Sequence, residues 1–238
     1  MNGLGWRALV SGGWLLLGAC AVPHGFLARP VAAPAEGTTT ISGGAVVPVA
    51  AVGGAIGEGS FQAATTKEYV LIPGAAFDYY YDEGYSFGVG VDVFTSAAIS
   101  GKSDDLSFLA IFVNPRFEAP LDGPDRRLSL TIDLNLGFLR SESGESRFQS
   151  PYFSPTVGLR AYLPTGFGGA VISQQIGTGF ITVIMPGSLA YDFPIPIGAT
   201  SKLHLFPEFR WDPTLVITGE GSGLLALFSG GLSFMFEL

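Results

Sequence analysis

The sequence predicts an all-β fold, an antiparallel up-and-down transmembrane β-barrel of about ten strands. Hydrophobic residues make up 47% of the 238 residues and charged residues only 13%. Two uncharged windows, residues 38–57 and 161–191, are long enough for a helical membrane span, but they are rich in glycine and contain proline. What recurs along the chain instead is alternation of apolar and small polar residues in segments of about ten residues, separated by turn residues.

Residues 127–140 form the clearest predicted strand. Its large apolar side chains alternate with serine, threonine, aspartate, asparagine and glycine, and they are Leu128, Leu130, Ile132, Leu134, Leu136 and Phe138. Successive side chains of a strand point to opposite faces, so this strand has one apolar and one polar face. Soluble β-sandwiches alternate too, but they usually carry more charge on the outer face than this chain does. The pattern therefore favours a barrel in lipid.

Nine further segments complete the predicted barrel. They are residues 43–58, 69–81, 85–97, 106–118, 152–163, 170–176, 180–193, 201–212 and 231–238. Without the two less obvious strands, 43–58 and 170–176, the count falls to the alternative of eight. We prefer ten, because eight would place the shortest turn, residues 82–84, on the outside and the acidic loops on the inside.

The connections predict which rim of the barrel is which. Compact turns rich in glycine or proline are expected at residues 82–84, 120–125, 164–169 and 194–200. Longer and more polar connections are expected at residues 60–68, 98–105, 141–150 and 213–223. Short turns usually lie on the periplasmic side of such barrels, so ten strands would return both chain termini to the periplasmic rim. Tyr79 and Tyr81 are expected to line up with Tyr85 and Phe87 across a hairpin, as part of an interfacial aromatic belt. Further candidates for the belt are Tyr191, Phe193, Trp211 and Phe236, and the alternative is that these residues only add apolar area.

The polar faces predict the candidate site, which is the lumen. The segment 201–212 places five charged or titratable groups on one face, Lys202, His204, Glu208, Arg210 and Asp212. Neighbouring strands add Asp78, Asp92, Arg116, Asp133, Arg160, Asp192 and Glu237. Buried charges need partners, so we expect ion pairs across a narrow lumen, with a narrow polar pore as the alternative.

The N-terminus carries a second signal, centred on the single cysteine of the chain. Arg7, an apolar stretch over residues 8–17 and small residues before Cys20 have the order of a secretory signal. Leu17-Gly18-Ala19-Cys20 resembles the lipobox of bacterial lipoproteins. The resemblance implies cleavage before Cys20, a covalent lipid on that residue and handling by the lipoprotein-sorting machinery. The expected organisation is a signal peptide at 1–19, a lipidated Pro/Ala-rich tether at 20–42, with a plug in the lumen as the alternative for that stretch, and the barrel at 43–238.

The C-terminal segment resembles the closing strand of outer-membrane barrels, through Leu232, Phe234 and Phe236. That resemblance implies recognition by the barrel-assembly machinery and a location in the bacterial outer membrane, with outer-membrane lipid as the surroundings. The chain ends on Leu238 where the family pattern has an aromatic residue. No particular subfamily is indicated, and the sequence leaves the oligomeric state open.

The sequence argues against several other functions. A net charge of −8 disfavours nucleic acid as a partner. No cofactor or metal site is expected, because His24 and His204 are the only histidines, although the loop carboxylates Asp104, Asp105, Glu142 and Glu145 are weak candidates for calcium.

Catalysis is not expected either. A lipid-modifying enzyme would use His204 as its base, but His204 lacks the His-x-Ser arrangement of lipid A deacylase barrels. The expected function is structural, or passage of small solutes through a narrow porin-like lumen. Two alternatives are a lipid-anchored soluble barrel whose Leu/Phe faces line a cavity for a hydrophobic ligand, and an adhesion or scaffold barrel acting through its loops.

Overall fold

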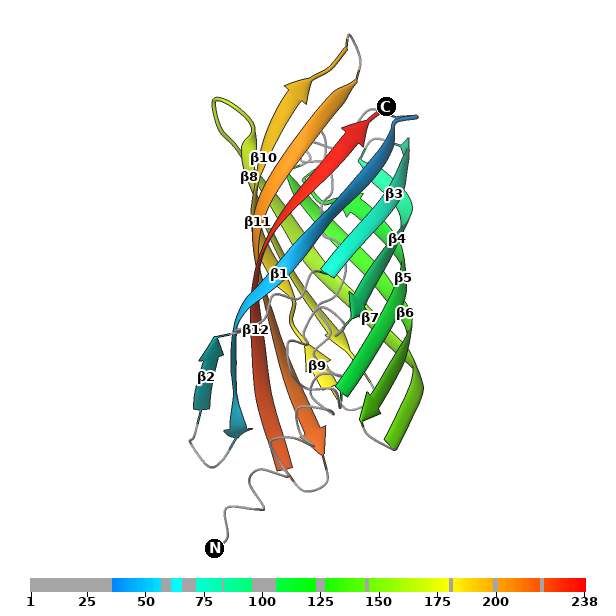
Figure 1. The fold of residues 1–238 in the computed structure, drawn as a ribbon. Coiled ribbons are helices and arrows are strands. Elements are labelled where there is room, and N and C mark those ends of the chain that lie inside the picture. Colours follow the sequence, from blue (N-terminus) through cyan, green and yellow to red (C-terminus); the bar gives the residue numbers. More distant parts are fainter. Residues whose placement is uncertain are drawn as a thin grey trace, which may run out of the picture.

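The structure is a computed structural model that describes residues 36–56, 61–65, 72–82, 84–95, 106–122, 127–143, 146–179, 182–198, 201–218 and 221–238. Within these ranges the chain forms one antiparallel sheet closed into a barrel (Figure 1). Its strands are β1 (Thr39–Ile56), β2 (Phe61–Thr65), β3 (Ile72–Asp82), β4 (Tyr85–Thr95), β5 (Leu106–Pro120), β6 (Leu128–Ser143), β7 (Ser146–Pro164), β8 (Gly169–Thr178), β9 (Thr182–Ile184), β10 (Gly187–Pro196), β11 (Lys202–Thr218) and β12 (Gly221–Glu237). No helix in the described part of the chain is long and apolar enough to cross a membrane.

The described residues form twelve strands, which corrects the predicted count of ten or eight. Two features account for the difference. Strand β2, which lies within the predicted loop 60–68, pairs only with β1 and stands outside the ring (Figure 1). Strands β9 and β10 are two parts of one pass that is interrupted at Met185 and Pro186, because proline has no N–H to donate to the ladder. The ring of paired strands runs β1, β3 to β8, β10, β11 and β12, and closes through β12 and β1.

The strand register sets the tilt of the barrel wall. Following paired residues once round the ring from β6 leads back to β6 about twelve residues away, and twelve residues of stagger over ten ring positions correspond to a strand tilt of about 40°. The value lies in the usual range for closed barrels.

Four short connections lie at one end of the barrel, which we call the turn rim. They follow β3, β5, β7 and β10, as the sequence predicts. The two ends of the sheet meet there as well, because the Thr39 N–H donates to the Leu238 carbonyl oxygen at 3.3 Å and the Leu238 N–H donates to that of Thr39 at 2.9 Å. The predicted strand at 43–58 therefore begins earlier, at Thr39.

One turn-rim carboxylate has a shifted pKa. The Arg127 N–H donates to Asp122 Oδ2 at 2.6 Å. Desolvation acts to raise the pKa of Asp122, but backbone hydrogen bonds at Leu128 and Arg127 and the positive charge of Arg127 together lower it. This contact links the described end of the β5 side to the residue that precedes β6.

Two long connections, 141–150 and 213–223, were predicted at the opposite end of the barrel, which we call the far rim. Both predictions are wrong. The ladder between β6 and β7 continues to Ser143 and Ser146, and that between β11 and β12 continues to Thr218 and Gly221. Backbone hydrogen bonds extend the strands well past the points where the alternation weakens. The predicted loop 98–105 lies outside the described residues.

The two faces of the wall have opposite chemistry. Outward side chains are mostly apolar, and inward ones are mostly polar and buried. On β6, the outward side chains Leu134, Leu136 and Phe138 are each more than a third exposed, while the inward Asn135 is 2% exposed. The soluble carrier considered above would need the Leu/Phe faces to point inward, so the observed orientation is the opposite of its requirement.

Aromatic rings on several strands lie over glycines of a paired strand. Phe234 covers Gly43, Trp211 covers Gly187 and Phe112 covers Gly137, and in each case the two residues are register partners. The ring fills the space that the missing side chain leaves, which helps to fix the register. Trp211 lies near the middle of β11 and not at an end, so its predicted place in an interfacial belt is wrong.

The expected aromatic hairpin is present at the turn rim. Tyr79 pairs with Phe87, and the ring centroids of Tyr81 and Tyr85 are 6.3 Å apart. All four side chains are exposed on the outer face. The position fits the boundary between a hydrocarbon layer and water.

Candidate functional site: the lumen

The lumen is lined by polar side chains that are nonetheless shielded from solvent. Buried carboxylates outnumber buried cations among the described residues. The carboxylates are Asp78, Asp92, Glu118, Asp133, Asp192, Glu208 and Asp212, and the cations are Arg116, Arg160 and Arg210, with His204 as a further titratable group. The site is therefore a packed and acidic interior.

An ion pair between β3 and β5 crosses strand β4 at the level of Gly88. Arg116 on β5 donates from Nε to Asp78 Oδ1 on β3 at 2.5 Å, and its Nη2 pairs with Oδ2 of the same carboxylate. Gly88 on β4 is the register partner of both residues and lies between them. A Cβ at Gly88 would come within 3.0 Å of the Asp78 carboxylate. The glycine makes room for a bidentate pair that runs along the inside of the wall.

A second ion pair continues the same line of charges. Arg160 on β7 pairs through Nη2 with Glu118 on β5, and both side chains are almost completely buried. The strand between them, β6, presents only the small residues Ser129 and Thr131 at this level. Opposite charges thus alternate from β3 through β5 to β7, and each guanidinium has a carboxylate neighbour.

A neutral amide makes a similar contact from β8 to β6, across strand β7. Gln175 on β8 donates from Nε2 to Thr131 Oγ1 at 3.2 Å and also to the Asp133 carboxylate, both on β6. Gly158 on β7 is the register partner of Gln175 and of Thr131, and a Cβ there would come within 3.0 Å of Gln175. Because Gly158 has no side chain, Gln175 can reach across β7 to β6, as Arg116 reaches across Gly88 to Asp78.

Strand β11 supplies the charges on the other side. Arg210 Nη2 donates to Glu208 Oε1 at 2.8 Å, and Ser233 Oγ donates to the same oxygen at 3.0 Å. Asp212 is buried next to this pair, and its Oδ2 has no hydrogen-bond partner among the described residues. These groups come from adjacent strands, in contrast to the pairs on β3 to β8.

His204 is held by two carboxylates near the turn rim. Its Nδ1 lies 2.9 Å from Asp192 Oδ1 on β10, and its Nε2 lies 3.3 Å from Glu237 Oε2 on β12. Glu237 also pairs with Lys202 at 3.4 Å. Both ring nitrogens are therefore engaged with carboxylates, which suits a structural imidazole better than a general base.

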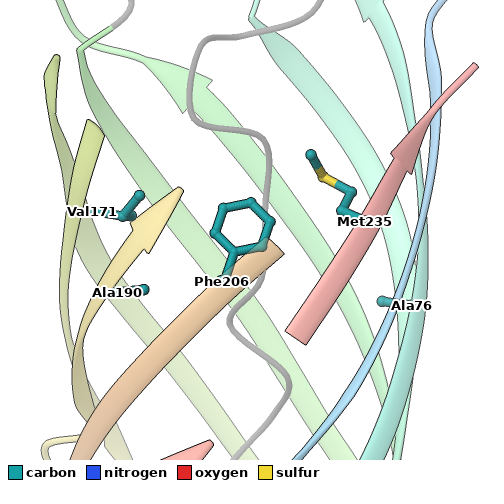
Figure 2. Packing of buried hydrophobic residues seen from close by; sticks show 5 residues of the cluster. All are labelled: Ala76, Val171, Ala190, Phe206 and Met235. Carbon is teal, nitrogen blue, oxygen red and sulfur yellow. The ribbon is translucent and has the colours of Figure 1, made fainter. Parts of the chain in front are cut away.

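An apolar cluster fills part of the lumen beside His204. Figure 2 shows Phe206 and Met235 directed into the interior, with Val171 and Ala190 on one side and Ala76 on the other. Phe206 and Met235 are at most 2% exposed. At this level the apolar side chains come mainly from β8 to β12, with Ala76 from β3, and the ion pairs of Arg116 and Arg160 lie on the β3 to β7 side.

The structure brings together most of the predicted cluster but divides it into separate groups. Glu208, Arg210, Asp133 and Arg160 are buried in the lumen, His204 lies nearer the turn rim, and Lys202 is half exposed at the rim itself. Sequence reasoning missed Glu118 and Gln175, which lie on inward positions of their strands. Continuing the alternation of 106–118 and 170–176 by parity would have identified both.

Several predicted sites lie outside the residues that the structure describes. Cys20, the signal segment and most of the tether fall outside the described residues, as do Asp104, Asp105 and Glu145. The side chain of Glu142 is likewise not described. In the described part of the chain, no group of three or more His, Cys, Asp or Glu side chains is arranged to hold a metal ion.

No protein-family model matches the chain, and no curated protein does. Several solved structures resemble it. The translocator domain of the autotransporter NalP from Neisseria meningitidis is 10% identical, with 97% of this chain and 96% of that chain covered and a TM-score of 0.41. Ail, the attachment invasion locus protein of Yersinia pestis, is 9% identical, with 84% and 99% covered and a TM-score of 0.35.

The P. putida toluene transporter TodX is 8% identical, with 86% and 90% covered and a TM-score of 0.26. Likenesses at these identities and TM-scores assign neither a family nor a function to the chain.

Proposed function

We propose that the chain is an outer-membrane lipoprotein whose closed β-barrel acts as a structural membrane element. The observation that carries the proposal is the inverted wall, apolar outside and polar inside. Such a wall is unfavourable in water, where exposed apolar patches are normally small. It is favourable in a bilayer, where a closed barrel also satisfies every backbone hydrogen bond.

The height of the apolar band supports this location. The outward side chains of β6 are apolar from Leu128 to Phe138, a distance of ten residues. At about 3.3 Å per residue and a tilt of about 40°, this band is roughly 25 Å high. That height matches the apolar band of outer-membrane barrels.

The packing of the lumen supports a structural role in preference to an open pore. Lining residues of a water-filled channel are solvated, whereas Asp78, Arg116, Glu118 and Arg160 are each at most 6% exposed. Their ion pairs lie along the wall, and the cluster around Phe206 occupies the other half of the interior. A passage would require several of these side chains to move.

In the proposal, a lipid on Cys20 adds a second attachment to a barrel that already spans the membrane. The lipid would reach the inner leaflet if the turn rim is periplasmic. Its role would then be sorting, or fixing residues 21–35 near that rim, and the barrel-assembly machinery would insert the strands.

The test is extraction of membranes from cells expressing full-length Cys20→Ala. Alkaline carbonate and, separately, urea should leave this variant in the membrane pellet, as they leave the wild type. Release of Cys20→Ala into the supernatant while the wild type is retained would contradict a spanning barrel, because the lipid would then be the only anchor.

A second candidate function is a narrow passage for small cations. The excess of buried carboxylates over guanidiniums favours it, since an acidic lumen attracts cations and repels anions. Planar-bilayer recording separates the two candidates. A silent wild-type barrel fits the structural role, and a steady cation-selective conductance fits the passage.

A further inference from the structure

The apolar outer surface is not equally high on all sides of the barrel. On β6 it ends at Phe138, because the next outward residue, Arg140, is charged and exposed. On β11 the outward residues remain uncharged to the end of the strand and include Leu215 and Ile217. The two strands lie nearly opposite each other in the ring, so the asymmetry divides the barrel into a low and a high side.

The high side is formed by β11, β12 and β1. Its upper part, which we call the tall strip, consists of Val49, Val52, Ile56, Leu215, Ile217, Leu224 and Phe228. These residues are exposed or half-exposed, with Val49 at 46%, Ile56 at 49% and Ile217 at 52%. No charged residue occurs in 47–56, 213–218 or 222–228.

The register allows the heights of the two sides to be compared. Ladder pairs lead from β6 through β5, β4, β3, β1 and β12 to β11, with about 1.2 residues of stagger at each strand. By this measure Ile217 lies within about one residue of Arg140 in height above the turn rim, and Ile56 lies roughly three residues higher. An apolar and a charged residue therefore stand at the same level on opposite sides.

The tall strip continues the surface that faces lipid. Below it on the same strands lie Phe209 and Trp211 of β11, and Phe209 stacks on Phe228 with ring centroids 6.2 Å apart. No polar belt separates the strip from this band. In Figure 1 the lower ends of β1, β11 and β12 extend together away from the turn rim.

We propose that the tall strip binds the acyl chains of bilayer lipids, so that the barrel sits tilted, with its β11–β12–β1 side deeper in the hydrocarbon than its β6 side. The inference rests on the proposed membrane location and adds to it a lipid-contact surface and an orientation. The physical cause is hydrophobic mismatch, which a membrane protein relieves by tilting or by thickening the bilayer around its longer side.

The test uses site-specific fluorescence in the full chain. Cys20 is the only cysteine, so Cys20→Ala is a cysteine-free background in which Ile217→Cys, Arg140→Cys and Leu136→Cys each accept one environment-sensitive fluorophore. The labelled variants are reconstituted in phosphatidylcholine vesicles with nitroxide-bearing acyl chains, and iodide is the water-soluble quencher. Folding is checked by heat-modifiable gel mobility.

The label at position 217 should be quenched by nitroxide lipid to about the same extent as that at 136 and several-fold more than that at 140, with the reverse order for iodide. Equal quenching at 217 and 140, with 136 strongly quenched, would overturn the tall strip and leave the membrane location intact. Protection of 217 from both quenchers would overturn it too, because a protein surface would then cover the strip. Absence of lipid quenching at 136 would contradict the proposed membrane location itself.

Discussion

Replacing Gly88 by alanine should break the best-defined ion pair of the lumen. The new Cβ would lie within 3.0 Å of both the Asp78 carboxylate and the Phe77 carbonyl oxygen. The carboxylate has to move, and the bidentate contact with Arg116 is lost or distorted. Removing one partner of a buried ion pair costs about 3–5 kcal/mol. Here the carboxylate is displaced and not removed, so we expect the free energy of unfolding to fall by about 3 kcal/mol, at the lower end of that range.

Gly90 provides the matched control on the same strand and the same face. A Cβ at Gly90 would meet its nearest atoms, in Ala75, Ala76 and Asn114, at 3.6 Å, which is ordinary van der Waals contact. Gly90→Ala should therefore change the free energy of unfolding by less than about 1 kcal/mol, and the loss of chain freedom in the unfolded state favours stabilisation.

The assay is equilibrium urea unfolding of both variants in lipid vesicles, followed by tryptophan fluorescence and checked by gel mobility. A difference of about 3 kcal/mol corresponds to roughly a hundredfold change in the unfolding equilibrium constant. The cost of Gly88→Ala should shrink when Asp78 is also replaced by alanine, because one of the two close contacts is then removed. Equal urea midpoints, and equal slopes of the unfolding free energy against urea concentration, for Gly88→Ala and Gly90→Ala would refute the idea that Gly88 makes room for the ion pair.

Three other substitutions test different parts of the wall. Arg160→Met should lower the free energy of unfolding by about 3–5 kcal/mol because Glu118 is left buried without its ion-pair partner, and Glu118→Met should recover much of the loss, both measured by urea unfolding. A double variant as unstable as Arg160→Met alone would contradict this pairing. Gln174→Leu should cost about 1–3 kcal/mol, because the outward-facing amide donates to the Met185 carbonyl oxygen at 3.0 Å and accepts from Trp211 Nε1 at 3.1 Å beside the break between β9 and β10, and Ile172→Leu on the same face should be nearly neutral. Leu134→Arg, in the middle of the apolar band, should cost about 2–4 kcal/mol in vesicles, and an effect as small as that of Arg140→Ala would argue against lipid at that level.

The barrel itself is largely predictable from the sequence because alternation reports directly on the two faces of a strand. Residues 127–140 show the pattern over six apolar positions, and β6 has the corresponding orientation. The compact turns at 82–84 and 164–169 were predictable from their glycine, proline and charged residues.

The strand ends were less predictable because hydrogen bonding continues where composition changes. Residues 213–218 and 222–228 lose their alternation, so the sequence favours a loop, yet the ladder between β11 and β12 runs through them. In the sequence, Gly144-Glu145 and Gly219-Glu220 lie between the paired strand ends, and a glycine followed by one residue is a composition favoured in two-residue hairpin turns. This signal would have indicated both corrections. Strand β2 had no such signal, since its pairing depends on β1 extending past β3.

The partners within the lumen could not be derived from composition. The alternation of side chains along each strand places Asp78, Arg116 and Glu118 on inward faces. Which of them form an ion pair depends on the residue of the intervening strand. Gly88 opens the space that joins Asp78 to Arg116, and Gly158 does the same for Gln175 and Thr131. Those glycines are visible in the sequence, while the register that gives them their role is a tertiary property.

A membrane-spanning barrel with an apolar outside and a packed polar inside is tested most directly by scanning β6 with single spin-labelled cysteines in the Cys20→Ala full chain in vesicles. Collision with lipid-soluble oxygen should alternate with a period of two, high at positions 130, 132, 134 and 136, and low at positions 131, 133 and 135. A water-soluble nickel chelate should reach neither set. Access of the chelate to positions 131, 133 and 135 would indicate an open water-filled lumen, and loss of the alternation, or its reversal, would contradict the barrel's orientation in lipid.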